Sequence, residues 1–286
     1  MYAITGITGQ VGGALARTLL AHQQSVRAVI RDAAKGASWS AQGCGVALAE
    51  MTDAAALTAA FTGTEGVFIL LPPVFDPQPG FPESRAVIAA LRAALIAAKP
   101  KKVVCLSTIG AQASQPNLLS QLSLMEQQLG SLPMPIAFLR AGWFLENTLW
   151  DIASARESGV IPSFLQPLDR KIPMVATADV GRVAAELLLE TWQARRVIEL
   201  EGPMRVSPND IAVGLAKALG RPVKAETVPR ETWGALFKSQ GMNDPMPRIQ
   251  MLDGFNEGWI DFERPAATVK GKVGLDQVLQ DLLQRG

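Results

Sequence analysis

The sequence predicts an α/β protein with a Rossmann-type, doubly wound parallel sheet and a smaller C-terminal α/β part. Two observations carry this prediction. Short apolar runs alternate with helix-like segments through roughly the first 140 residues, a pattern typical of a parallel sheet covered by helices on both faces. The chain of 286 residues, 48% of them hydrophobic and 19% charged, is also long and apolar enough to bury a sizeable core.

Short apolar runs of about four to five residues are the predicted strands of the sheet. They cover residues 2–5, 26–30, 46–49, 67–71, 102–106 and 136–139. Segments with apolar residues at helical intervals lie between them, at residues 10–21, 54–61, 83–98 and 118–129. Because strand and helix alternate in this way, we expect right-handed crossovers and strands that all run parallel.

The pattern changes after Arg140, where prolines interrupt the alternation between residues 159 and 173. Ser207 followed by Pro208 is a good helix start, and Gly220 is a good stop for the same helix. We expect this half to form a small cap on the carboxyl edge of the sheet. Its predicted elements are helices at 143–158, 178–192, 208–218, 231–240 and 248–257 and a strand at 196–200.

The scarce residue types exclude several kinds of site. His22 is the only histidine, which argues against a multi-histidine metal site and a histidine-based catalytic triad, so no metal is expected. Cys44 and Cys105 are the only cysteines, and both lie in apolar segments. A disulfide framework is therefore not expected either.

The charge balance limits the partners. Lysine and arginine total 27 and aspartate and glutamate 26, for a formal net charge of +1. No broad electrostatic surface for nucleic acid or anionic lipid is therefore expected. The sequence opens directly on a predicted strand, and no apolar run reaches about 18 residues. We expect a cytoplasmic protein that does not insert into a membrane, as a monomer or a homodimer.

A glycine-rich turn, Gly6-Ile7-Thr8-Gly9-Gln10-Val11-Gly12, joins the first predicted strand to the first predicted helix. Glycines let the backbone turn sharply and approach a pyrophosphate, and the start of the helix offers free N–H groups to it. The turn lacks the strict G-x-G-x-x-G spacing, and the simpler alternative is a turn without a ligand. The flanking strand and helix favour binding through Gly6, Thr8, Gly9, Gln10, Val11 and Gly12.

The end of the second predicted strand indicates which dinucleotide binds. In this fold an acidic residue here accepts the 2′-hydroxyl of NAD(H), whereas an arginine binds the 2′-phosphate of NADP(H). Arg31 precedes Asp32, and Lys35 follows about one turn later, so two cations favour NADP(H). In the alternative interpretation, Arg31 is a solvated surface residue and Asp32 caps a short helix. Residues 1–150 are accordingly the predicted NADP(H)-binding domain and residues 151–286 the smaller substrate-binding part, which can interleave near the boundary.

Several motifs resemble the NmrA-like branch of the atypical short-chain dehydrogenase/reductase superfamily. They include residues 4–12 and 26–32. The segment Leu139-Arg140-Ala141-Gly142-Trp143-Phe144-Leu145-Glu146-Asn147 is the most characteristic of them, and residues 178–184 and 200–207 are similar to the family's C-terminal half. The resemblance covers most of the chain, and several motifs in the same order are more specific than the glycine turn alone.

The resemblance implies a Rossmann domain that binds NADPH and a small C-terminal domain that forms a cleft over the nicotinamide. Family members include NADPH-dependent quinone reductases, reductases of dyes and unsaturated nitrogen compounds, and non-catalytic regulators that sense NADP(H). The positions that the resemblance implies are Leu71, Pro72 and Pro73 along the cofactor, Ser107 and Thr108 near the nicotinamide ribose, Gly142, Trp143 and Phe144 beside the nicotinamide, and Trp143, Phe144 and Asn147 near the substrate.

Two departures from the family pattern restrict the mechanism. Classical members of the superfamily use a tyrosine as proton donor and a lysine four residues later. Tyr2, inside the first predicted strand, is the only tyrosine, and the predicted helix at 118–129 has no lysine. Gln127 is the best match to the lysine; it can hydrogen-bond a ribose hydroxyl, but it cannot lower a neighbour's pKa by positive charge. Alcohol oxidation or ketone reduction through a tyrosyl acid is therefore disfavoured.

We expect an NADPH-dependent oxidoreductase that transfers hydride to a quinone-like or other conjugated electrophile without a tyrosine–lysine pair. Thr108, Gln127 and Asn147 are the candidate donors to developing negative charge, with turn capping as the alternative role for Asn147. Trp143 and Phe144 offer flat faces to an aromatic or quinone-like substrate, and core packing explains them equally well.

The proline-rich segment 72–82 follows the fourth predicted strand, at the ligand edge of the sheet. Phe75 is expected to line the mouth of the pocket there, and a rigid surface connection is the alternative. Two other functions stay open: a non-catalytic NADP(H)-sensing regulator and a biosynthetic enzyme for an aromatic natural product. The missing tyrosine and lysine favour the sensor, whereas the lack of an appended recognition element disfavours it.

Overall fold

An eight-stranded sheet forms the centre of the computed structural model, which describes residues 1–285. The strand order is β3-β2-β1-β4-β5-β6-β10-β12, and all neighbours pair in parallel. Because the order reverses beside β1, the sheet is doubly wound, as predicted. Its strands are β1 (Tyr2–Thr5), β2 (Val26–Ile30), β3 (Gly45–Leu48), β4 (Gly66–Leu70), β5 (Val103–Thr108), β6 (Ile136–Ala141), β10 (Arg195–Glu201) and β12 (Val269–Lys270).

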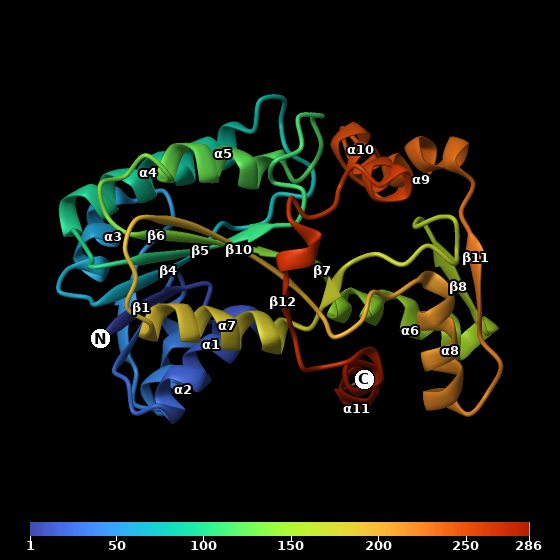
Figure 1. The fold of residues 1–286 in the computed structure, drawn as a ribbon, viewed down its shortest axis with the longest axis horizontal. Helices are drawn as coiled ribbons and strands as arrows, with labels where there is room; N and C mark the ends of the chain where they lie inside the picture. Colours follow the sequence, from blue (N-terminus) through green and yellow to red (C-terminus); the bar gives the residue numbers. More distant parts are fainter. Residues whose placement is uncertain (286) are drawn as a thin grey trace.

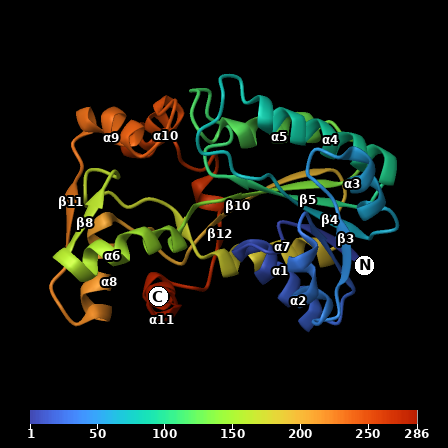
Figure 2. The same cartoon turned by 180° about the vertical axis from the view of Figure 1, so that it is seen from behind.

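Helices cover both faces of this sheet (Figure 1), and Figure 2 shows the same two layers from behind. Side chains alternate along each strand between two cores: in β4, Phe68 packs in one core, and Val67 and Ile69 pack in the other. One layer holds α1 (Gln10–Ala21), α2 (Gly36–Ser40) and α7 (Thr177–Leu189), and the other holds α3 (Ala54–Phe61), α4 (Pro82–Ala98) and α5 (Ser120–Leu129).

One glycine allows α1 and α7 to pack at close range. A Cβ atom at Gly181 would lie 2.6 Å from the Cβ of Ala14 and 2.7 Å from the backbone nitrogen of Leu15. Any side chain at this position would push the two helices apart, because its Cβ atom would collide with the Ala14 Cβ and the Leu15 backbone of α1. The glycine of the family-like segment 178–184 therefore serves packing.

The C-terminal part has its own core, beside the sheet in Figure 1. Trp233 and Phe237, both fully buried, lie at its centre. Its elements are the strand pairs β7 (Trp143–Phe144) with β9 (Met174–Val175) and β8 (Val160–Ser163) with β11 (Lys224–Thr227), the helices α6 (Leu149–Ser158), α8 (Pro208–Leu219), α9 (Trp233–Ser239), α10 (Met246–Glu257) and α11 (Leu275–Arg285), and short 3-10 turns that include η2 (Leu145–Thr148).

The two parts interleave along the chain. The chain leaves the sheet after β6, builds β7 to β9, and returns for α7 and β10. It then leaves again for α8 to α10, returns for β12, and ends in α11. Residues beyond 150 thus supply two strands and one helix to the Rossmann part, and a division at residue 150 stays a prediction.

Most predicted elements are found at or within about two residues of their expected bounds. The predicted helix at 143–158 is wrong in its first half. Trp143 and Phe144 form β7, where the Trp143 N–H donates to the Pro173 carbonyl (2.9 Å), and the helix begins only at Leu149. The elements β8, β9, β11, β12, α2 and α11 are not among those predicted.

None of the helices within residues 1–285 combines the length and the apolar character needed to cross a bilayer. The same residues contain no group of three or more histidine, cysteine, aspartate or glutamate side chains placed to hold a metal ion. Cys44 and Cys105 are both buried free thiols.

Candidate functional site

All strands of the sheet run parallel, so the segments that follow them meet at one edge. This carboxyl edge brings together the predicted turn at 6–12, Arg31, the segment 71–73, Ser107 with Thr108, and the segment 142–144. The predicted site residues of the first half of the chain are therefore neighbours along one rim, although they come from five separate strands.

The glycine turn after β1 is shaped by close backbone contacts. Gly6 has a positive φ of 65°, which favours glycine, and the Gly9 N–H donates to the Gly6 carbonyl (3.0 Å). A Cβ atom at Gly12 would lie only 2.3 Å from the Gly6 carbonyl oxygen, whereas one at Gly9 would lie 3.4 Å from the same atom. Gly12 is therefore required by packing, and Gly9 borders open space.

The start of α1 has the features of an anion site. Gly9 occupies the N-cap position, and no side chain caps the helix there. The N–H groups of the first turn therefore keep the positive end of the helix dipole directed at the space above the turn. Thr8 and Gln10 are exposed at this point, whereas Val11 is buried beneath it. An uncapped helix start with exposed residues around it suits a pyrophosphate group.

The side chain of Gln10 connects the turn to the C-terminal part. Its Oε1 accepts a hydrogen bond from Thr177 Oγ1 (3.1 Å), and the Thr177 backbone N–H donates to Glu146 Oε1 (2.9 Å). Gln10, Glu146 and Thr177 line a small cavity of about 130 Å³ beside α11. Glu146, from the segment that resembles the family, thus satisfies the first N–H of α7.

The end of β2 leaves two cations without partners. Asp32 caps the 3-10 turn η1 (Ala33–Lys35) by accepting the Ala34 N–H at its Oδ1 (2.9 Å). Arg31 and Lys35 are exposed, and their side chains form no hydrogen bond or ion pair within residues 1–285. Because the nearby carboxylate is used locally, the free charges at this point are positive and suit a phosphate group.

Ser107 faces away from the α1 layer. The strand alternation that directs Val103 and Cys105 toward α4 and α5 also directs Ser107 there. Its hydroxyl donates to Glu126 Oε1 (2.6 Å), a buried carboxylate on α5. Thr108 points to the opposite side and is half-buried.

Glu126 belongs to a buried ionic network that the sequence analysis missed. Arg140 on β6 donates from Nε to Glu126 Oε1 (2.9 Å) and from Nη2 to Glu126 Oε2 (2.8 Å). Its Nη1 also reaches Glu263 (3.0 Å) and Glu199 (3.5 Å). Burial alone would lower the pKa of Arg140, but the bonds and charge of Glu126, followed by those of Glu263, outweigh it and raise the pKa.

Gln127, the predicted match to the family's lysine, is exposed on α5 and makes no side-chain hydrogen bond in the described part of the chain. Within the same stretch, Glu126 is the residue whose side chain reaches the sheet. The helical spacing of the buried Met125 and Leu129 could have indicated this, because it places position 126 on the covered face and position 127 on the open one.

The two aromatic residues of β7 pack in different cores. Phe144 packs against the core under α1 and α7, whereas Trp143 packs against the C-terminal core. The Trp143 ring meets the Phe255 ring edge to face, with centroids 5.2 Å apart. A Cβ atom at Gly142 would lie 2.7 Å from the Pro173 carbonyl oxygen, which explains the glycine before this pair.

Asn147 lies in η2, four residues after Trp143, and is half-buried. No side chain caps η2, and no side chain caps α6 after it. The Asn147 amide makes no hydrogen bond in the part of the chain that the structure describes. The predicted alternative of a turn cap is therefore not found, and the amide is free to contact a ligand.

The proline-rich loop after β4 fastens the C-terminal part to the Rossmann part. Asp76 accepts hydrogen bonds from the Asn243 backbone N–H (2.9 Å), the Asn243 amide (2.7 Å) and the Asp244 backbone N–H (3.0 Å). The backbone bonds from Asn243 and Asp244, followed by the amide bond, lower the pKa of Asp76. Phe75 beside it is 61% exposed. Leu71 is buried, and Pro72 and Pro73 are progressively more open.

Asp151 and Arg248 of the C-terminal part are both partly buried, and neither forms an ion pair within residues 1–285. Asp151, in the first turn of α6 and four residues beyond Asn147, is partly exposed and makes no hydrogen bond within residues 1–285. Burial raises its pKa to about 7. Arg248, on α10, is half-buried, and burial lowers its pKa. No sequence motif marks either residue.

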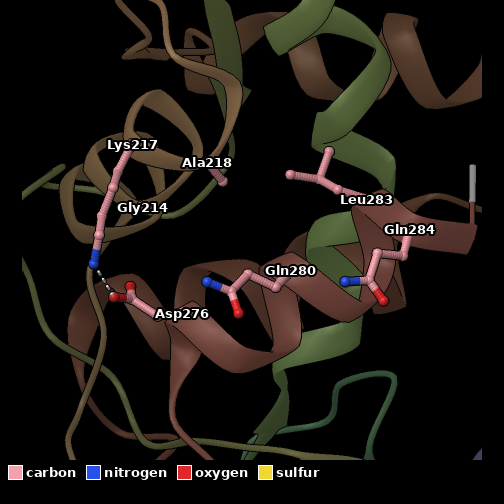
Figure 3. A pocket seen from close by; sticks show the side chains of 7 residues that line it. All are labelled: Gly214, Lys217, Ala218, Asp276, Gln280, Leu283 and Gln284. Carbon is pink, nitrogen blue, oxygen red and sulfur yellow. Dashed lines mark hydrogen bonds and ion pairs between the residues drawn. The ribbon is translucent and has the colours of Figure 1, made fainter.

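An open groove of about 390 Å³ between α8 and α11 is separate from this edge (Figure 3). Lys217 and Asp276 form an ion pair across it (2.7 Å), and Gln280 and Gln284 line its floor beside Leu283. It contains none of the predicted site residues, and dinucleotides bind outside the carboxyl ends of the strands in this fold. The candidate site is therefore the carboxyl edge.

Known proteins match this chain over most of its length. The family model described as "NmrA-like family" matches residues 2–257. An NAD(P)H azoreductase of Xenophilus azovorans is 28% identical over 90% of this chain and 85% of its own. Quinone oxidoreductase 2 of Escherichia coli is 31% identical over 85% of this chain and 83% of its own. The crystal structure of an Escherichia coli NADPH-dependent quinone oxidoreductase in complex with NADPH superimposes with a TM-score of 0.83, at 26% identity, over 99% of this chain and 100% of that one.

Proposed function

Because the chain belongs to the NmrA-like family, we propose that it is an NADPH-dependent oxidoreductase that reduces a quinone-like or other conjugated electrophile. The relatives it matches are named as quinone and azo reductases that use NADPH or NAD(P)H. The observation that carries the proposal is the carboxyl edge itself, where an uncapped helix start and two unpaired cations lie at the positions of a pyrophosphate and a 2′-phosphate.

The cofactor fits the residues present. A Cβ atom at Gly9 would meet only the Gly6 carbonyl oxygen, at 3.4 Å, so a pyrophosphate could approach the backbone there, and Gly12 allows α1 to start directly beneath it. Arg31 and Lys35 would hold the 2′-phosphate, since Asp32 is already bonded within η1. Bound NADPH would supply the hydride for the reaction.

On the substrate side, the chain would act mainly by position and polarity. Trp143 offers an aromatic face where the C-terminal part meets the sheet. Asn147 and Thr108 would donate hydrogen bonds to the oxygen that gains negative charge, Asn147 through an amide that the fold leaves free. The C-terminal elements on this edge would exclude water from the reacting atoms.

The reaction would proceed without a tyrosine–lysine pair. Tyr2 lies in β1 and is 8% exposed, within the core under α1 and α7, so it cannot serve as a proton donor at this edge. Electrophilic acceptors that form stabilised anions need no strong acid in the transition state. Water or Asp151, whose pKa lies near neutrality, would then protonate the product. If Asp151 is the proton donor, the pH profile of kcat shows an ionisation near pH 7 in the wild type, and the profile of Asp151→Asn lacks it.

The decisive experiment has two steps. A binding titration with NADPH and NADH comes first, followed by NADPH oxidation in the presence of a panel of quinones. We expect tighter binding of NADPH than of NADH, and turnover with at least one quinone. Tight NADPH binding without turnover would favour the alternative of a non-catalytic NADP(H) sensor, and failure to bind either cofactor would overturn the proposal.

A further inference from the structure

Arg248 has an aromatic environment and no acidic partner among residues 1–285. Its guanidinium carbon lies 4.2 Å from the centroid of the Phe237 ring and 5.9 Å from that of the Phe164 ring. The Arg248 side chain is half-buried, and this burial lowers the pKa of its guanidinium. The rings stabilise the cation through their faces, but they provide no hydrogen-bond acceptor.

The other arginines of the chain differ from Arg248. The buried Arg140 and the partly buried Arg182 and Arg205 each form ion pairs with carboxylates. Arginines without a side-chain bond, such as Arg31 and Arg92, are exposed to water. Among the arginine side chains that the structure describes, Arg248 alone is withdrawn from full exposure and forms neither a hydrogen bond nor an ion pair. A cation in this state gains most from an anionic ligand, since desolvated charges are costly until they are paired.

α10 connects Arg248 to the substrate side of the sheet. Arg248 and Phe255 are two helical turns apart and lie on the same face of α10. Phe255 contacts Trp143 edge to face. The Pro247 carbonyl accepts the Leu118 N–H (2.9 Å), which fixes the start of α10 beside the segment that follows β5. The Cα atoms of Arg248 and Phe255 are therefore about 10 Å apart along the helix axis, a separation comparable to the length of a bicyclic aromatic acid.

We propose that Arg248 binds a carboxylate carried by the aromatic acceptor, so that the preferred substrates are aromatic acids. This inference rests on the proposed function, because it places the acceptor at Trp143. A guanidinium presents parallel N–H donors that match a carboxylate, and here it lies over the Phe237 ring. The acceptor would lie with its reducible end near Trp143 and its acid group at Arg248.

The phosphates of the cofactor are poor candidates for this partner. The pyrophosphate position is the turn after β1, and the 2′-phosphate position is Arg31 after β2. β2 lies on the far side of β1 from β5 and β6, whereas Pro247, the residue before Arg248, is hydrogen-bonded to the segment after β5. A cofactor extended from β2 toward Trp143 would bring its nicotinamide, which has no phosphate, to the α10 end.

The test uses a ligand pair that differs only in charge. 2-Naphthoate is an aromatic carboxylate at neutral pH, and 2-naphthamide is its neutral analogue. Their binding to NADP⁺-saturated protein is measured by titration calorimetry for the wild type, Arg248→Met, Arg248→Lys and the matched control Arg92→Met, which removes an exposed, unpaired charge from α4. Melting temperatures and NADPH affinities are measured for all four proteins.

We expect Arg248→Met to weaken 2-naphthoate at least tenfold and to leave 2-naphthamide within twofold. Arg248→Lys should lose part of the affinity, because lysine keeps the charge without the paired donors, and Arg92→Met should match the wild type. Equal affinity of the wild type and Arg248→Met for 2-naphthoate, or no binding by the wild type, would overturn the inference. So would a weakened NADPH affinity in Arg248→Met with unchanged 2-naphthoate binding.

Turnover with a neutral naphthoquinone tests the proposed function separately. If the wild type oxidises NADPH with this quinone and 2-naphthoate binding ignores Arg248, the reductase function stands and the carboxylate subsite fails. If 2-naphthoate binding depends on Arg248 and no quinone is reduced, the subsite stands and the choice of acceptor fails.

Discussion

Two regions of the molecule treat a withdrawn arginine in opposite ways. Between the sheet and α5, Arg140 is surrounded by the carboxylates of Glu126, Glu199 and Glu263, and its charge is fully compensated by the fold. In the C-terminal part, Arg248 lies over Phe237 and forms no ion pair with any carboxylate that the structure describes. The charge of Arg140 is already paired within the fold, whereas the charge of Arg248 would be paired only by an anionic ligand.

The contrast separates residues that hold the fold from residues that are available to ligands. Glu146 and Asp179 belong to segments that resemble the family, and Glu126 lies in the helix that departs from the family pattern. Each is saturated by internal bonds: Asp179, for example, accepts the backbone N–H groups of Lys272 and Val273 (both 2.8 Å). Arg31, Asn147 and Arg248 are not saturated. We therefore expect mutations in the first group to change stability and mutations in the second group to change binding.

The largest expected effect tests the compensated region. Arg140→Met would leave the buried Glu199 without an ion-pair partner in the described part of the chain, and Glu126 with only the more distant Arg195 (3.9 Å). We expect the free energy of unfolding to fall by about 3–5 kcal/mol. Urea denaturation measures this change. Arg92→Met, which removes an exposed arginine from α4, should change the same quantity by less than about 0.5 kcal/mol. A similarly small effect for Arg140→Met would end the distinction between the two regions.

The glycine turn sharpens the same distinction. A side chain at Gly9 has room in the fold but enters the space above the turn, so Gly9→Val should weaken NADPH and NADH by at least about 100-fold with little loss of stability. A Cβ atom at Gly12 meets backbone 2.3 Å away, so Gly12→Ala should lower the melting temperature itself. Fluorescence titration and thermal melting of both variants separate the two outcomes; retained cofactor affinity in Gly9→Val would contradict the pyrophosphate assignment.

Arg31 tests an unsaturated group of the Rossmann part. Arg31→Ala should weaken NADPH by roughly 10- to 100-fold and NADH by less than about twofold, because a charged contact to phosphate is lost only for the first. Parallel titrations with both cofactors measure the ratio. Equal weakening of NADPH and NADH would refute the assignment of Arg31 to the 2′-phosphate.

Asp151 provides the smallest effect, and its sign is fixed by the direction of its pKa shift. Burial raises the pKa from 3.8 to about 7, so the fold prefers the protonated acid, and stability is lost as the pH rises through this interval. Asp151→Asn removes the ionisation. Relative to the wild type, Asp151→Asn should therefore be more stable at pH 8 than it is at pH 5. The stability difference between the two proteins should be larger at pH 8 by about 1–2 kcal/mol, after allowance for partial exposure.

Urea denaturation at the two pH values measures this difference. Asp169→Asn, a change at an exposed carboxylate, is the matched control and should show no such dependence. If Asp151→Asn were less stable than the wild type at pH 8, the side chain would be making a stabilising contact as a carboxylate.

The strands and helices of the first 140 residues could be predicted from sequence because each is defined locally. α3 begins where Asp53 caps it, accepting the N–H groups of Ala55 and Ala56 (2.9 and 3.0 Å), and β1 and β2 are apolar runs. The short strands β11 and β12 carry charged residues and exist only because they pair with β8 and β10. No local pattern marks such strands.

The site residues fall into the same two groups, those that a local sequence pattern marks and those that it does not. The glycine turn and Arg31 follow from spacing along the chain, since the fold fixes where a βα turn lies. Arg248 and Asp151 could not be found in this way, because what distinguishes them is the absence of a partner, and partners come from segments distant in sequence. Gln127 shows the converse: its neighbour Glu126 was the buried residue, and one position along a helix changes the direction of a side chain by about 100°.

The interleaved chain has a consequence for how the two parts could be separated. A fragment that stopped at residue 150 would lack β10 and β12, and the outer edge of β6, with its buried Phe138 and Leu139, would present unpaired backbone to solvent. Such an edge recruits other chains and aggregates. Residues 1–150 are therefore not a transplantable module. Any recombination that exchanges the C-terminal part must also carry over two strands of the Rossmann sheet and helix α7, which packs on β4, β5 and β6.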